Sequence, residues 1–313
     1  MVLLHPTASA IVKNVERVLL GKTEPIKLCV AVLLSDGHVL IEDMPGVGKT
    51  VLARSLAISI GATYTRVQFT PDLLPGDITG VQIYNQDTRQ FDFRPGPIMT
   101  QVLLADEINR ATPRTQSALL EGMDERRLTL DGVTYPLPEP FIVLATQNPL
   151  EFEGTYPLPE SQLDRFLISL RLGYPDRQNE LSMLSLQEDG HPLETLASVA
   201  TIGELRGLQQ AAREIYVDDL IRQYILDIVE ATRSRPDIRL GASPRATLAL
   251  FRLAQSWALL HGRDYVLPDD VKAVAGAVLR RRIIPAGYIE GLDDLDRFVN
   301  TLIQSVPVPG NRG

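Results

Sequence analysis

The sequence of 313 residues contains a single cysteine, and this scarcity excludes two kinds of cross-link. A disulfide framework needs paired cysteines and a cysteine-based metal site needs several, so neither can form. Cys29 lies in an apolar run from Leu28 to Leu34, where a small core residue is expected. The four histidines are scattered without the spacing of metal ligands. The fold must therefore depend on its hydrophobic core.

Long apolar runs and an excess of positive charge are also absent. No stretch approaches the length needed to span a bilayer, and the first residues lack the features of a signal peptide. We therefore expect a cytoplasmic protein with no membrane partner. The formal net charge is −8 and the pI is about 5.1, so no global basic field favours nucleic acid as a ligand.

A glycine-rich segment follows the predicted strand 39–42 and precedes the predicted helix 49–59. It reads Pro-Gly-Val-Gly-Lys-Thr over residues 45–50. Glycines let consecutive backbone N–H groups curl around phosphate oxygens, a lysine adds a point charge, and a threonine hydroxyl can reach a magnesium ion. The residues predicted to bind the nucleotide are Gly46, Val47, Gly48, Lys49, Thr50 and Val51. The full pattern asks for glycine where this chain has Asp43, which puts the first turn of the loop in doubt.

Two carboxylates end a second apolar strand, predicted over residues 102–106. Asp106 is suited to hold a magnesium ion, and Glu107 to polarise a water molecule for attack on a γ-phosphate. Acidic residues end many strands as solvated caps, so this pair alone is a weak signal. Together with the glycine-rich loop it forms a Walker A and Walker B pair, which predicts hydrolysis of a nucleoside triphosphate.

The arrangement of predicted elements divides the chain into two parts. Apolar strands at 39–42, 64–69, 102–106, 141–146 and 167–170 alternate with helices, which predicts a parallel sheet covered on both faces. Helical spacing prevails later, at 202–215, 218–233, 244–261 and 267–282. We therefore expect an α/β nucleotide-binding domain over residues 1–172 and a smaller all-helical domain over residues 173–313.

This order resembles the AAA+ ATPases, in which a phosphate-loop core precedes a helical lid. Segments 68–77, 93–98 and 105–111 are similar to the MoxR family within that group, and the resemblance extends from about Val12 to about Arg282. It implies an ATPase that uses ATP and Mg²⁺, with Thr50 and Asp106 holding the metal.

The resemblance also assigns catalytic residues outside the Walker motifs. Asn148 follows a predicted strand and resembles the sensor that holds the attacking water. Arg165 lies in a segment similar to the one that carries the arginine finger, which reaches the nucleotide of a neighbouring subunit. Arg245 resembles the arginine of the lid that contacts the nucleotide of its own chain. The implied catalytic set is Lys49, Glu107, Asn148, Arg165 and Arg245.

Two inserts are predicted to form hairpins, at residues 82–93 and 126–135. Residues Asp131 and Gly132 give the second one a strong turn signal. In related rings such hairpins line a pore or touch the client, although short hairpins also merely cover sheet edges.

The family resemblance implies a homo-oligomer, usually a ring of six subunits. It further implies chaperone-like remodelling, maturation or activation of a client protein complex, with a partner that carries a von Willebrand factor A domain. Three alternatives remain open on sequence grounds: nucleic-acid remodelling, a magnesium-chelatase-type motor, and a nucleotide-gated scaffold that hardly hydrolyses.

Overall fold

A parallel β-sheet forms the centre of the structure, a computed structural model that describes residues 5–149, 154–188 and 192–310. Its order is β2-β5-β8-β1-β9, and all four neighbouring pairs are parallel. The strands are β1 (Val39–Glu42), β2 (Tyr64–Gln68), β5 (Val102–Asp106), β8 (Ile142–Gln147) and β9 (Ile168–Leu170). Strands β1 and β5 are buried throughout, which agrees with their nearly continuous apolar sequence.

Helices cover both faces of the sheet because successive strand residues point to opposite sides. On one face, Val39 and Ile41 join a cluster with helices α1 (Pro6–Glu16), α2 (Thr23–Leu34) and α3 (Lys49–Ser59). On the other, Leu40 and Leu103 join a cluster with α5 (Pro113–Glu125). Cys29 is fully buried in the first cluster, as expected for a core residue, and burial raises the pKa of its thiol.

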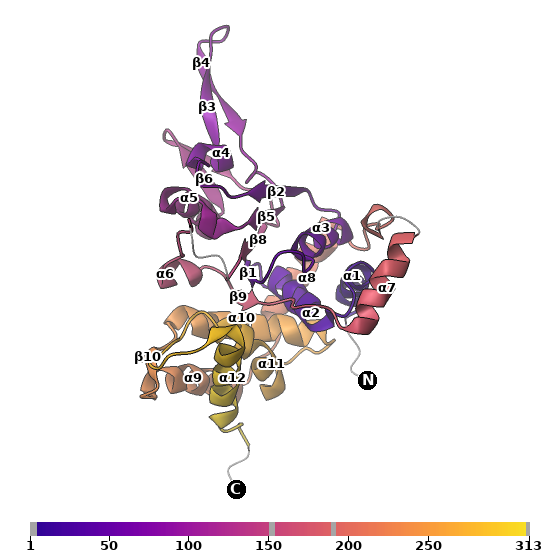
Figure 1. Cartoon of the computed structure of the whole chain (residues 1–313), viewed down its shortest axis with the longest axis vertical. Coiled ribbons are helices and arrows are strands. Elements are labelled where there is room, and N and C mark those ends of the chain that lie inside the picture. Colours follow the sequence, from indigo (N-terminus) through magenta and orange to yellow (C-terminus); the bar gives the residue numbers. More distant parts are fainter. Residues whose placement is uncertain (1–4, 150–153, 189–191, 311–313) are drawn as a thin grey trace.

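Helices form most of the later part of the chain: those from residue 219 onward lie below the sheet in Figure 1, whereas the two over Arg177–Glu188 and Ile202–Glu214 lie higher, beside α1 and α2. Each helix with a side-chain cap begins at a residue of the expected type: Thr201, Asp218 and Ser243 accept backbone N–H groups. The elements are α7 (Arg177–Glu188), η2 (Pro192–Glu194), α8 (Ile202–Glu214), α9 (Asp219–Ser234), β10 (Ile238–Leu240), α10 (Pro244–Leu260), α11 (Pro268–Leu279), β11 (Ile284–Pro285) and α12 (Gly291–Ser305).

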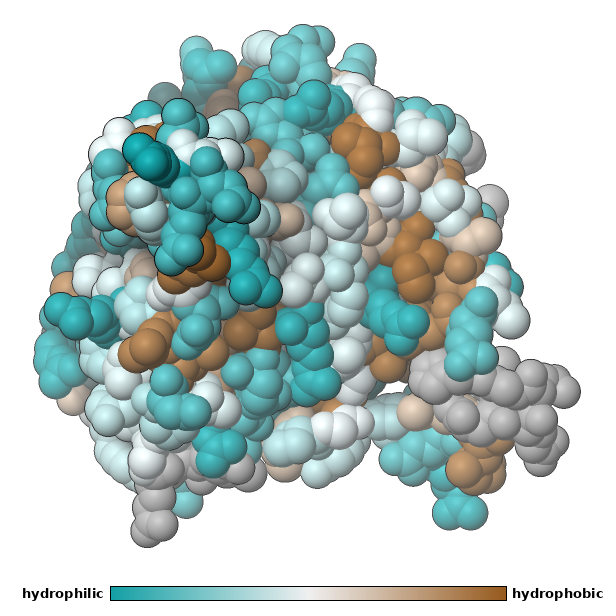
Figure 2. All heavy atoms as spheres, turned by 90° about the horizontal axis from the view of Figure 1, so that it is seen from above, coloured by the Kyte–Doolittle hydropathy of each residue, from teal (hydrophilic) through white to brown (hydrophobic). Residues whose placement is uncertain are grey.

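Both predicted hairpins are present. The first, β3 (Gly80–Asn85) with β4 (Gln90–Pro95), follows the short helix α4 (Pro75–Thr79) and projects from the top of the molecule (Figure 1). The second pairs β6 (Arg127–Leu130) with β7 (Val133–Pro136). The rings of Phe93 and Tyr135 stack between the two hairpins with centroids 4.0 Å apart. Viewed from this end, apolar surface occurs as separate patches among hydrophilic residues (Figure 2).

The observed architecture confirms the predicted fold class. Strands β1 and β5 and helix α3 have the bounds predicted from sequence, whereas α7 and α12 were not predicted. Among the described helices, none combines the length and apolar character needed to cross a membrane.

Candidate nucleotide site

The glycine-rich loop connects β1 to α3, as its sequence requires. Gly46 and Gly48 have φ values of 85° and 98°, in the left-handed region where glycine is favoured. A Cβ at position 48 would lie 2.6 Å from Leu19 Cδ1, so a side chain there would also displace the end of that leucine. Lys49 begins the helix, which places Thr50 and Val51 in its first turn beside the positive end of the helix dipole.

The loop's lysine turns back towards the start of the loop. Lys49 Nζ donates a hydrogen bond to the backbone oxygen of Asp43 at 2.6 Å. This places its ammonium group across the mouth of the loop, between the strand end and the helix start. The loop therefore provides two features that favour phosphate binding: a cation and the N-terminus of a helix.

Asp106 and Glu107 lie at the carboxyl end of β5, where Thr146 of β8 connects them. Thr146 Oγ1 donates to Asp106 Oδ1 at 2.6 Å and accepts from the backbone N–H of Glu107 at 2.9 Å. Thr146 is fully buried and Asp106 is 9% exposed. Glu107 has a φ of 56°, a left-handed conformation that turns its side chain away from the strand direction. A buried hydroxyl thus fixes the carboxylate of Asp106 relative to the backbone of Glu107.

Two side chains of β2 bind these carboxylates from the adjacent strand. Arg66 forms an ion pair with Asp106 at 2.6 Å, and Gln68 Nε2 donates to Glu107 Oε2 at 2.7 Å. Arg110 approaches the same Glu107 oxygen at 3.2 Å. Asp106 is therefore paired with a cation, and Glu107 with an amide and a cation. A bound nucleotide and its metal would have to displace these partners or share the carboxylates with them.

Asn148 follows β8, which lies between β1 and β5 in the sheet. Since the carboxyl ends of parallel strands meet at one edge, Asn148 lies between the glycine-rich loop and Asp106. Its side chain is 6% exposed. The structure thus brings together, at this carboxyl edge, the predicted residues Gly46, Val47, Gly48, Lys49, Thr50, Val51, Asp106, Glu107 and Asn148.

Arg165 and Arg245 lie at the opposite edge of the sheet. They line one hollow of about 320 Å³ together with residues that immediately precede strands, among them His38 before β1 and Leu167 before β9. Arg165 contacts Asp124 at 2.9 Å and the backbone oxygen of Leu120 at 2.8 Å. The length of β1, about 10 Å at 3.3 Å per residue, separates this edge from the glycine-rich loop.

This placement corrects the expected contact between Arg245 and the nucleotide of its own chain. Ser243, which caps α10, donates to Asp164 Oδ2 at 2.7 Å. That bond fixes the start of α10 beside Asp164 and Arg165, ahead of β9. In this structure Arg245 therefore lies at the same edge as Arg165, and the glycine-rich loop with Lys49 lies at the other edge of the sheet.

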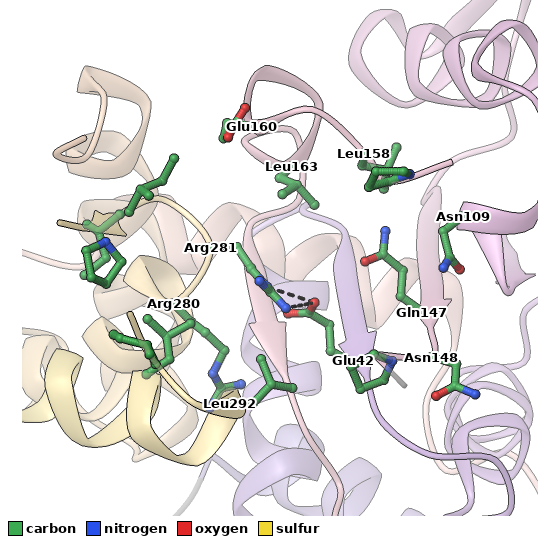
Figure 3. A pocket seen from close by; sticks show the side chains of 18 of the residues that line it. Glu42, Asn109, Gln147, Asn148, Leu158, Glu160, Leu163, Arg280, Arg281 and Leu292 are labelled. Atoms are coloured by element: carbon green, nitrogen blue, oxygen red, sulfur yellow. Dashed lines mark hydrogen bonds and ion pairs between the residues drawn. The ribbon is translucent and has the colours of Figure 1, made fainter. Parts of the chain in front are cut away.

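Consecutive arginines at the end of α11 dock the helical part against the sheet. Arg282 is 6% exposed at its side chain and pairs with Asp164 at 2.6 Å; burial lowers its pKa, and the Asp164 carboxylate opposes that shift. Arg281 pairs with Glu42, the last residue of β1, at 2.6 Å (Figure 3). A cavity of about 570 Å³ lies next to this contact, lined by Gln147 and Asn148 from the sheet and by Leu292 from α12.

Comparison with known proteins identifies the family. Residues 38–168 match the model of the ATPase family associated with various cellular activities (AAA), and residues 230–299 match the AAA lid domain. The chain is 52% identical to YeaC of Bacillus subtilis, over 99% of this chain and 97% of YeaC. It is 41% identical to the chaperone MoxR1 of Mycobacterium tuberculosis, over 95% of this chain and 81% of MoxR1. The chain belongs to the MoxR family of AAA+ ATPases.

A solved structure supports the same assignment. A candidate ATPase of Cytophaga hutchinsonii superposes with a TM-score of 0.87 at 35% identity, covering 96% of this chain and 94% of that one. The MoxR-type chain is accordingly a nucleotide-binding ATP hydrolase, with an AAA+ core followed by a helical lid.

Sequence reasoning missed three residues of the MoxR-type site: Arg66, Gln68 and Thr146. Arg66 and Gln68 point to one side of β2, since they are two residues apart. That alternation was readable from sequence, but their partners lie 39 or 40 positions away on another strand. Thr146 ended a predicted strand next to Asn148, and only the pairing of β8 with β5 reveals its contacts.

Proposed function

We propose that this chain assembles into a homo-oligomeric ring, with six subunits as the expected number, and couples ATP hydrolysis to the remodelling of a client protein complex. The observation that supports assembly is the separation of charges across one sheet. The phosphate-binding residues lie at the carboxyl edge, and Arg165 and Arg245 lie at the amino edge. A head-to-tail contact between subunits would bring the two edges together.

The chemistry of the carboxyl edge fits ATP with Mg²⁺. Thr50 and Asp106 offer the oxygen donors that this hard cation prefers, and Asp106 already pairs with the cation of Arg66. When bound there, Mg²⁺ would neutralise charge on the β- and γ-phosphates. Lys49 and the loop N–H groups would hold the same phosphates. Glu107 would accept a proton from the attacking water, and Asn148 would orient it.

The amino edge fits the complementary half of the site. Its hollow is lined by five arginines and three aspartates, an excess of positive charge suited to an anion presented by another subunit. Arg165 and Arg245 would stabilise the charge that develops on the transferred phosphoryl group, as an arginine finger does. Hydrolysis would then require assembly.

The remodelling part of the proposal rests on the hairpins and on family membership. Hairpin β3–β4 exposes Val81, Ile83, Tyr84 and Phe91. Exposed aromatic and aliphatic side chains on a projecting element fit contact with a protein client better than with solvent. A partner carrying a von Willebrand factor A domain is inferred from the MoxR family alone.

The deciding experiment measures ATPase rate per subunit against protein concentration. It compares wild type, Glu107→Gln, Arg165→Ala and an equimolar mixture of the two variants. We expect the wild-type rate per subunit to rise with concentration, and the mixture to recover activity that neither variant has alone. A flat wild-type rate, with Arg165→Ala equal to wild type, would contradict the shared site and indicate a self-contained phosphate-loop switch.

A further inference from the structure

A buried carboxylate occupies the position at which this chain departs from the phosphate-loop pattern. Asp43 is 2% exposed, and both of its oxygens accept backbone hydrogen bonds. Oδ1 accepts from the N–H of Met44 at 2.9 Å, within the loop. Oδ2 accepts from the N–H groups of Leu172 and Gly173, each at 2.7 Å. One side chain thus connects the loop to the segment that leads from β9 to the helical part.

The neighbouring residue makes a second connection of the same kind. Glu42 is 1% exposed and accepts from Ser169 of β9 at 2.6 Å. Arg281 Nε lies 2.8 and 2.7 Å from its two carboxylate oxygens (Figure 3). Arg281 follows α11, so this contact ties the end of β1 directly to the helical part. Consecutive acidic residues therefore connect the start of the loop by two routes: Asp43 to the chain that follows β9, and Glu42 to the lid through Arg281.

The backbone of Asp43 also takes part in the arrangement of the loop. Its carbonyl oxygen accepts the hydrogen bond from Lys49 Nζ. If the ammonium group turned towards a phosphate, this contact would lengthen or break, and the peptide between Asp43 and Met44 would be freed from it. The carboxylate of Asp43 accepts a hydrogen bond from the N–H of that same peptide, which belongs to Met44. A movement of this peptide would therefore also move the Asp43 side chain, whose other oxygen accepts hydrogen bonds from Leu172 and Gly173.

We propose that Asp43 is a positioning residue that couples nucleotide binding in the loop to the orientation of the chain that leads from β9 to α7, while Glu42 connects the same end of β1 to the lid through Arg281. The inference rests on the nucleotide site proposed above. Glycine at position 43 would still allow the loop to bind phosphate, but more weakly, because the loop would lose its connection to Leu172 and Gly173. The departure from the general pattern then has a function of its own, namely to make the loop sensitive to the segment that follows β9.

Asparagine is the informative substitution because of how the two oxygens are used. A carboxylate can accept hydrogen bonds in both directions, whereas an amide has one acceptor oxygen and one donor nitrogen. In Asp43→Asn, an NH₂ group would replace one of the two carboxylate oxygens. This group would face a backbone N–H, which is also a donor, so no hydrogen bond could form there. The variant can therefore satisfy either Met44 or the pair Leu172 and Gly173, but not both. Its shape is otherwise unchanged, so the fold is retained.

The test measures amide hydrogen exchange at residues 172 and 173 of the full chain, with and without ADP and Mg²⁺, alongside the ADP dissociation constant. In wild type we expect ADP to change exchange at these two amides. In Asp43→Gly, which loses all three hydrogen bonds, we expect these amides to exchange at least about tenfold faster without nucleotide, no response to ADP, and ADP binding weakened about tenfold. In Asp43→Asn, which keeps one side of the connection, we expect the response of the two amides to ADP to be lost. Asp218→Asn is the matched control, since both oxygens of Asp218 also accept hydrogen bonds, from Leu220 N–H and Tyr216 OH.

Arg281→Gln tests the second route without touching the loop, and we expect it to weaken ADP binding and the response at 172 and 173 in the same direction. Unchanged affinity and an unchanged response in the Asp43 variants would overturn the proposal. So would wild-type protein that binds ADP without any response at 172 and 173. Failure of wild type to bind ADP would instead overturn the nucleotide site itself, so the two failures are distinguishable.

Discussion

The guanidinium of Arg66 lies 2.6 Å from the carboxylate of Asp106, the residue assigned to the metal. The arginine side chain is 48% exposed, so the pair is open to competition from solvent ions. A divalent cation at Asp106 has to share or displace this arginine.

Removing that competing cation should ease metal binding. In Arg66→Gln we expect the Mg²⁺ concentration for half-maximal ATPase activity to fall about 1.4- to fivefold, because exposed ion pairs contribute about 0.2–1 kcal/mol. The measurement is a magnesium titration at saturating ATP. Arg222→Gln is the control, since Arg222 is comparably exposed, at 55% of its side chain, and pairs with Asp219 on α9, away from the site. A higher magnesium requirement in Arg66→Gln would show that the arginine assists the metal instead.

Thr146 should matter for catalysis beyond its share of stability. Thr146→Val keeps the shape of the side chain but leaves Asp106 Oδ1 and the Glu107 N–H without their hydrogen bonds. We expect the free energy of unfolding to fall by about 1–3 kcal/mol. We also expect kcat to fall at least about tenfold with little change in KM, since the Asp106 carboxylate and the backbone of Glu107 lose the hydroxyl that fixes them relative to each other.

Thr232 of α9 provides the matched control for that substitution. It is also fully buried, donates to the Val229 oxygen at 2.6 Å and accepts from the Ala242 N–H at 2.9 Å. Urea unfolding and steady-state kinetics should show that Thr232→Val loses similar stability but retains most of kcat. Equal losses of kcat in both variants would show that Thr146 contributes to stability and has no separate effect on catalysis.

The shared edge of Arg165 and Arg245 predicts a specific pattern of complementation. If both arginines serve the neighbouring subunit, a mixture of Arg165→Ala and Arg245→Ala contains no interface with both arginines, and activity stays low. Each variant should nevertheless recover activity when mixed with Glu107→Gln. ATPase assays of the three pairwise mixtures check this. Recovery in the double-arginine mixture would instead mean that Arg245 serves its own subunit.

His38 should make the fold sensitive to acid. Its Nδ1 accepts from the Val143 N–H and its Nε2 contacts the Met123 oxygen, while burial and then the Arg126 charge lower its pKa to about 3. The unfolded chain titrates near pH 6.5, so between these values it binds a proton that the folded chain does not. Stability is therefore complete above about pH 6.5 and falls as the pH decreases, by up to about 1.4 kcal/mol per unit.

Replacing His38 by glutamine should remove that contribution. Urea unfolding of wild type and His38→Gln at several pH values from 4.5 to 7.5 gives the two slopes. We expect the variant to be less stable at pH 7.5 but to lose less stability on acidification. Parallel slopes would show that another group carries the titration.

The sequence predicted those parts of the structure that depend on local patterns. Apolar runs located β1 and β5, and the glycine-rich loop fixed the start of α3, because each signal lies within a few residues. Helix α7 lacks a clear apolar face and was missed. Helix α12 was missed although Asp293 and Asp294 in its first turn are a helix-start signal.

The sequence predicted the site residues that belong to a local motif. It did not predict those that only tertiary packing brings to the site. Arg66 and Thr146 reach Asp106 only because β2 and β8 flank β5 in the sheet. The edge on which Arg245 lies depends on how Ser243 and Arg282 dock against Asp164. No local pattern encodes these contacts, which join residues 40 to 118 positions apart.

The apolar cluster beneath the sheet passes without a break through α2 into α8 and α10 of the helical part. Parting the lid from the core would therefore expose apolar surface at a cost of about 25 cal/mol for every Å². A wide hinge opening between the core and the lid is therefore disfavoured. The continuous apolar contact between the two parts instead permits packed helices to slide past one another. For the same reason the two parts should melt together, in one cooperative calorimetric transition.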